Sequence, residues 1–191
     1  MRQLSFFSVD ARPPAIGDLA GLLCGPGQAV RFGRGGMARL SVVVADRWRV
    51  HALAAECAER GVGAELATSE EGMPLLRTAF RADLADLAAR WIRGAVKAVP
   101  AGLQLDGPAL RLWAAAAGRS DGRGYLFGLD PHAPDTHEPL AAAMARAGLT
   151  PVLLGPRGGG PALRVTGRRR LGRLVELVGA PPDGAATWPA D

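Results

Sequence analysis

The sequence predicts an α+β fold with an internal pseudo-twofold repeat, in which antiparallel strands form one sheet and helices cover one face of it. Three observations support this prediction. The order helix, strands, helix, hairpin, helix occurs twice along the 191 residues. Several segments carry apolar residues at intervals of three and four, as amphipathic helices do. Between them lie short extended segments with glycine-rich turns, which are typical of β-hairpins.

The first half, residues 1–100, begins with a short extended segment within residues 1–14 and continues with a helix at 16–24. In that helix, Leu19 and Leu23 share one apolar face. Glycine turns, capping residues and apolar stripes place the other elements of this half, which are strands at 28–33 and 38–45, a helix at 47–61, strands at 63–69 and 74–80, and a helix from 83 to 97.

The second half, residues 101–180, repeats this plan, and the segment 51–66 aligns with 138–153. Residues 119–123 form a linker where the first half has a strand, and residues 181–191 lack periodicity and predict a mobile tail. The predicted elements of this half are a helix at 109–118, a strand at 124–130, a helix at 137–148, strands at 150–156 and 161–167, and a helix at 168–179.

The segment LAGLLCGPG at 19–27 resembles the motif of LAGLIDADG homing endonucleases, and the αββαββα order, present twice, resembles their fold. This resemblance implies a saddle-shaped sheet and two motif helices packed side by side along a pseudo-twofold axis. More closely, the chain resembles the N-terminal domain of WhiA-type sporulation regulators. The stretches that carry this likeness are DLAGLLCGPGQAVRFGRGGMARLSVVVA and LRLWAAAAGRSDGRGYLFGLD.

In LAGLIDADG endonucleases, an acidic residue at the penultimate position of each motif binds a divalent metal for phosphodiester hydrolysis. Pro26 and Ala117 occupy these positions here, and neither side chain has an oxygen to offer a hard cation. Asp18, Asp106 and Asp121 are near in sequence but lie at the far end of the motif helices or beyond them. The resemblance therefore implies a catalytically inactive domain without a metal or other cofactor.

Composition indicates a polyanionic partner and excludes several other classes of protein. The net charge is +5 and the pI is about 10.4, which favours nucleic acid. Lys97 is the only lysine, so a GC-rich, actinobacterial-type codon usage is a second explanation for the many arginines. We expect a cytoplasmic protein, because no apolar run suits a membrane span or signal peptide. Cys24 and Cys57 have apolar neighbours and predict buried thiols.

Strand alternation predicts a basic open face on the sheet, because each of four strands places an arginine opposite its larger apolar residues. The candidate nucleic-acid-binding residues are Arg31, Arg39, Arg77 and Arg164 in strands and Arg34, Arg119, Arg123 and Arg157 in turns. Leu126 is an exception, since it points away from the apolar face of Tyr125 and Phe127. The alternative interpretation is an ordinary solvated sheet face.

One loop offers candidate metal ligands. Asp130, His132, Asp135 and His137 lie within eight positions, and their side chains suit Zn²⁺ or Mn²⁺. The same residue types are equally typical of turns and helix caps between a strand and a helix. The glycine-rich segments lack the lysine and hydroxyl residues of a phosphate-binding loop.

These observations support three hypotheses. The first is a non-catalytic DNA- or other nucleic-acid-binding protein with a DNA-related or regulatory role, acting as a monomer because the pseudo-twofold axis lies within one chain. The second is a protein-interaction module of the same fold. The third is a residual metal-dependent nuclease.

Overall fold

The structure is a computed structural model that describes residues 7–157 and 159–190. The extended segment predicted within residues 1–14 lies partly outside this range. Its described part contains a 3-10 turn, Val9–Ala11, in place of a strand. No helix in the described part of the chain is long and apolar enough to cross a membrane.

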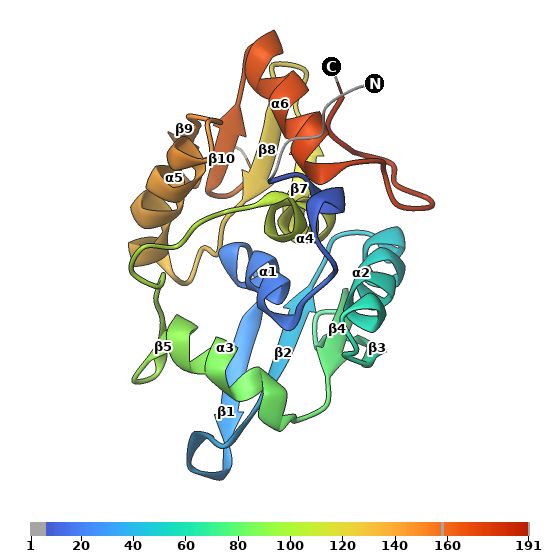
Figure 1. Cartoon of the computed structure of the whole chain (residues 1–191), viewed down its shortest axis with the longest axis vertical. Helices are drawn as coiled ribbons and strands as arrows, with labels where there is room; N and C mark the ends of the chain where they lie inside the picture. The colour runs from blue at the N-terminus through green and yellow to red at the C-terminus, as the bar shows by residue number, and fades with distance from the viewer. Residues whose placement is uncertain (1–6, 158, 191) are drawn as a thin grey trace.

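Each half contains a motif helix, a four-stranded sheet and two further helices, and the first half adds a short two-stranded hairpin (Figure 1). The elements of the first half are α1 (Ala20–Cys24, preceded by a 3-10 turn at Ile16–Leu19), β1 (Gln28–Phe32), β2 (Met37–Val43), α2 (Arg47–Glu59), β3 (Ala64–Thr68), β4 (Pro74–Thr78) and α3 (Ala85–Trp91). Those of the second half are α4 (Gly107–Ala117), β7 (Gly118–Ser120), β8 (Tyr125–Gly128), α5 (His137–Arg146), β9 (Val152–Leu154), β10 (Ala162–Val165) and α6 (Arg168–Val178).

Two predicted boundaries are wrong. The helix predicted to run to residue 97 ends at Trp91, and a hairpin of β5 (Ile92–Arg93) and β6 (Val96–Lys97) follows it. Gly94 has a φ of 64°, which permits this tight turn. The predicted linker at 119–123 begins inside β7, which pairs with β8. Three residues are too few to show the alternation that identifies a strand from sequence.

The strands form two four-stranded antiparallel sheets with the same order, β1-β2-β4-β3 and β7-β8-β10-β9. The prediction of one continuous sheet is therefore wrong, whereas the prediction of a repeated plan is confirmed. Helices α1 and α4 lie side by side in the middle of the molecule and join the halves (Figure 1). A helix pair, and not a strand pair, thus forms the junction.

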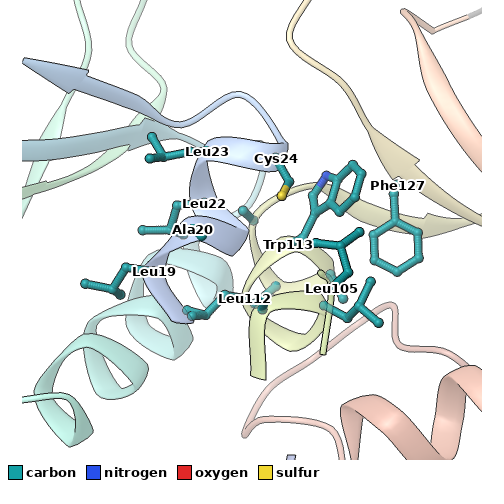
Figure 2. Close-up of a cluster of buried hydrophobic side chains, with 14 of the residues drawn as sticks. Leu19, Ala20, Leu22, Leu23, Cys24, Leu105, Leu112, Trp113 and Phe127 are labelled. Atoms are coloured by element: carbon teal, nitrogen blue, oxygen red, sulfur yellow. The ribbon is translucent and has the colours of Figure 1, made fainter. Parts of the chain in front are cut away.

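The core is continuous across this junction. Figure 2 shows Cys24 of α1 beside the indole ring of Trp113 of α4, and the Phe127 ring of β8 on the other side of Trp113. The rings of Trp113 and Phe127 are 5.0 Å apart. The indole N–H of Trp113 donates to the carbonyl of Gly128 at 2.8 Å, so the buried polar atom is satisfied.

The segment for which the sequence predicts a mobile tail makes contacts with the body of the protein. Residues 181–190 contain no helix or strand. However, Trp188 donates through its indole N–H to Gly179 and lies 5.3 Å from the guanidinium of Arg111. Thr187 accepts a hydrogen bond from Arg49. These contacts hold the segment against the body of the protein.

Candidate nucleic-acid interface

The open face of the first sheet follows from its strand register. Residues directly opposite in an antiparallel pair point to the same face. Arg39 of β2 pairs with Val30, and Ser41 pairs with Arg77 of β4. Leu40 and its alternate neighbours are buried under the helices, so Arg39 and Arg77 lie on the side away from them, as predicted.

Arg31 lies on the opposite face from the one predicted. It pairs with Ala38, which is completely buried on the helix side. Its guanidinium folds over the next turn, where a Cβ on Gly35 would be 2.1 Å from it. Val30 and Phe32 lie on the open face instead. The end of β1 extends beyond the helices, so the expectation that polar residues occupy the face away from the helices fails there.

Two of the predicted arginines form ion pairs with carboxylates on the same sheet face. Arg77 forms an ion pair with Glu65 on the neighbouring strand. Arg164 of β10 lies 2.5 Å from Asp121. The pKa of Asp121 is lowered, because burial, which would raise it, is outweighed by hydrogen bonds from the Arg123 N–H and Arg164. These pairs fix the arginines in place and reduce the positive charge that each offers.

Arg39 is stacked on an aromatic ring. Its guanidinium carbon is 4.8 Å from the ring centre of Phe80, and Phe80 is 5.3 Å from Phe32. Both rings are exposed, at 58% for Phe32 and 36% for Phe80. The open face of the first sheet therefore carries both cations and aromatic rings. The position of arginines in the sequence does not predict this combination.

The second sheet has a hollow of about 720 Å³ on its open face. Arg119, Leu126 and Arg164 lie in one row across β7, β8 and β10. Leu126 is only 4% exposed and forms the floor between the two arginines, while Arg157 contributes from the following loop. The outward position of Leu126, an exception in the sequence pattern, is thus explained by its place in this hollow.

Arg34 and Arg123 are exposed in turns at the strand ends. Arg34 adopts a φ of 57°, within the glycine-rich turn between β1 and β2. Arg119 donates to the carbonyl of Gly159 at 3.3 Å, which tethers the loop that carries Arg157. The structure therefore places seven of the eight predicted arginines on or beside the two open faces, and Arg31 behind the first.

The ends of the two motif helices contain buried cations. At the end of α1, next to Pro26, the Lys97 ammonium donates to the Gly25 carbonyl at 2.8 Å. The Lys97 ammonium also forms a 2.9 Å ion pair with Asp130. The side chains of Lys97 and Asp130 are 7% and 3% exposed, and Gln28 donates to the same carboxylate at 2.6 Å.

At the end of α4, Arg49 reaches across from α2 of the other half. Its guanidinium donates to the carbonyls of Ala115 at 2.9 Å and Gly118 at 2.6 Å. A helix C-terminus is the negative end of the helix dipole and attracts cations. Each motif helix thus ends on a cation supplied by the protein itself. Sequence reasoning missed both residues, although a single lysine among apolar neighbours is an available signal for Lys97.

The candidate metal ligands are occupied by other interactions or dispersed. The Asp130 carboxylate forms an ion pair with Lys97 and accepts hydrogen bonds from the Gln28 amide and the backbone N–H of His132. The backbone carbonyl of Asp130 lies 2.8 Å from Nε2 of the His137 ring. His132 and Asp135 are exposed in the same loop. Within residues 7–157 and 159–190, no three His, Cys, Asp or Glu side chains are grouped as a metal site. Asp130 therefore acts as the partner of a buried lysine.

The fold is α+β and saddle-like, and it resembles the fold of a LAGLIDADG homing endonuclease. Among solved structures, the chain is similar to the homing endonuclease I-WcaI bound to its DNA recognition sequence, with a TM-score of 0.58 and 11% sequence identity. The similarity covers 85% of this chain and 79% of the other. No protein-family model matches this chain, and no curated protein matches it. At this identity the likeness shows the fold alone.

Proposed function

We propose that this chain is a nucleic-acid-binding protein without nuclease activity, which binds its ligand through the two open sheet faces. The role is a DNA-related or regulatory one, and the chain acts in the cytoplasm as a monomer. The likeness to a homing endonuclease bound to its DNA recognition sequence supports this function, because the two proteins share one architecture.

The arginines on the open faces carry the proposal. Arg39 and Arg34 lie on or beside the first face, and Arg119, Arg157 and Arg164 surround the hollow on the second. Phosphate oxygens accept hydrogen bonds from guanidinium groups, and such contacts supply most of the sequence-independent affinity for nucleic acid. The ion pairs of Arg77 and Arg164 reduce this charge without removing it.

The ends of the motif helices support the absence of nuclease activity. A metal-dependent nuclease needs carboxylates there to hold divalent cations. This chain has Pro26 and Ala117 instead, with Lys97 and Arg49 bonded to the nearby carbonyls. A second positive ion next to either side chain would experience strong repulsion in a buried setting.

Binding is tested by fluorescence anisotropy with a short labelled duplex and its single strand, at low and moderate salt. We expect affinity to fall with salt, and the Arg119→Ala/Arg157→Ala double variant to lower the slope of log K against log salt by about 1 for each lost phosphate contact. Arg90→Ala on α3 is the matched control, because Arg90 is exposed in the helix layer. Affinity that ignores both salt and the double variant would favour the protein-interaction alternative.

Catalysis is tested by incubating supercoiled plasmid with the purified chain and Mg²⁺ or Mn²⁺. We expect the plasmid to stay intact. Metal-dependent cleavage that disappears in His132→Ala would establish the residual-nuclease alternative and overturn this part of the proposal.

A further inference from the structure

We propose that the ligand of this chain is single-stranded nucleic acid, whose unpaired bases stack on Phe32 and Phe80 of the first sheet. This inference rests on the proposed function and specifies its ligand class. The surface concerned, named here the aromatic platform, consists of Phe32, Phe80 and Arg39, with Val30 beside them.

The aromatic platform is exposed although its residues are of the kind that normally fill cores. Phe32 is 58% exposed, Phe80 is 36% exposed and Val30 is 43% exposed. Exposed apolar side chains that lie together on a regular element mark a binding surface more often than those scattered singly. Trp113 and Phe127 are completely buried, so exposure is not a general feature of the aromatic residues of this chain.

The charge around the platform identifies nucleic acid as its occupant. The Arg39 guanidinium lies over the Phe80 ring, and the exposed Arg34 follows Phe32 in the turn. Flat rings with cations beside them match the two parts of a nucleotide, a planar base and a phosphate. If the occupant were a protein with a purely apolar surface, binding would bury the Arg39 charge without an acidic partner, which costs free energy.

The geometry further indicates single strands. In a B-form duplex the base faces are stacked on one another, and only base edges and phosphates are accessible. Phenylalanine has no hydrogen-bonding group for an edge or a phosphate. In a duplex its ring can contact only the thymine methyl group, whereas it stacks on the full face of a base that is unpaired or displaced from the stack.

The test compares a labelled oligothymidine with a duplex of the same length by fluorescence anisotropy on the intact chain. The variants are Phe32→Leu and Phe80→Leu, which keep an apolar side chain but remove the aromatic ring. The control is Leu66→Ala, because Leu66 is 46% exposed on the same sheet but pairs with the buried Leu76 and so faces the other side.

We expect the single strand to bind more tightly than the duplex, and each leucine variant to weaken single-strand binding about fivefold or more. Duplex binding and the Leu66→Ala control should change little. Circular dichroism and thermal unfolding confirm that the variants remain folded.

Other outcomes separate this inference from the proposed function. Tighter duplex binding that depends on Arg119 and Arg157 but not on the rings would leave the proposed function standing and overturn the inference. No salt-dependent binding to either ligand would overturn both. A dimer, measured by light scattering, that dissociates in Phe32→Ala would assign the aromatic platform to a second copy of the chain and also overturn the inference.

Discussion

Gly21 permits the close contact between the two motif helices. A Cβ at this position would lie 2.1 Å from the backbone oxygen of Ala109, where neither helix can yield. We expect Gly21→Ala to lower the free energy of unfolding by about 1–3 kcal/mol or more, because overpacking forces backbone shifts. Urea denaturation measures the loss. Gly17→Ala is the matched control, since a Cβ there meets nothing within 4 Å; equal losses in both variants would contradict this explanation.

Asp130 gives the stability a defined pH dependence. Burial acts to raise the pKa of its carboxyl, but the hydrogen bond and charge of Lys97, with the His132 N–H and Gln28, lower it overall. Burial likewise lowers the pKa of Lys97, against the effect of Asp130. Because the pKa of Asp130 is lower in the folded chain, its ionised form stabilises the fold above about pH 4, the unfolded value. That contribution is lost as the pH falls through the folded pKa.

We therefore expect Asp130→Asn to lower the free energy of unfolding at pH 7 by about 3–5 kcal/mol, because it leaves the Lys97 charge buried and unpaired. The difference from the unaltered chain should shrink below about pH 4. Urea titrations between neutral and acidic pH provide the measurement. Asp135→Asn, exposed in the same loop, should have little effect, and Lys97→Met should recover stability in the Asp130→Asn background. A pH-independent difference would rule out the ionised pair as the cause.

At the scale of elements, Arg49 of α2 stabilises the end of α4 in the other half. It is 4% exposed and donates to several C-terminal carbonyls of that helix. We expect Arg49→Met to lower the free energy of unfolding by about 2–4 kcal/mol, because buried carbonyls lose charged donors. Thermal unfolding measures the effect. Arg47→Met, at an exposed position on the same helix, is the control, and a similar loss there would show that the carbonyl contacts are unimportant.

The elements also show where sequence patterns are informative. The long segments α2, α4, α5 and α6 have apolar periodicity and capping signals over ten residues or more, and they lie where predicted. The β5–β6 hairpin and β7 have two or three residues per strand, which is too short for a pattern to emerge. At β1, the sequence shows alternation but not which alternate residues face the helices. The helices cover only part of this strand, and Phe32 remains exposed.

At the scale of the whole molecule, the two halves share one core. Helices α1 and α4 contact each other more extensively than either contacts its own sheet, and Arg49 and Lys97 each bond across the junction. We expect a single cooperative unfolding transition with coincident curves from tryptophan fluorescence and circular dichroism. Trp91 reports on the first half and Trp113 on the second. Two separate transitions would show that the halves fold independently.

The sequence by itself determined the repeated α+β plan and shows that residues 26 and 117 are Pro and Ala, because local periodicity and single positions can be seen in a linear chain. The side-by-side packing of the two motif helices was implied by the resemblance to LAGLIDADG proteins. Only the tertiary structure decided that the strands form two sheets, that Lys97 and Arg49 occupy the helix ends, and that Arg31 lies behind the sheet while Phe32 and Phe80 lie exposed. These features depend on which distant segments meet, because burial and charge pairing are set by the neighbours that folding brings together.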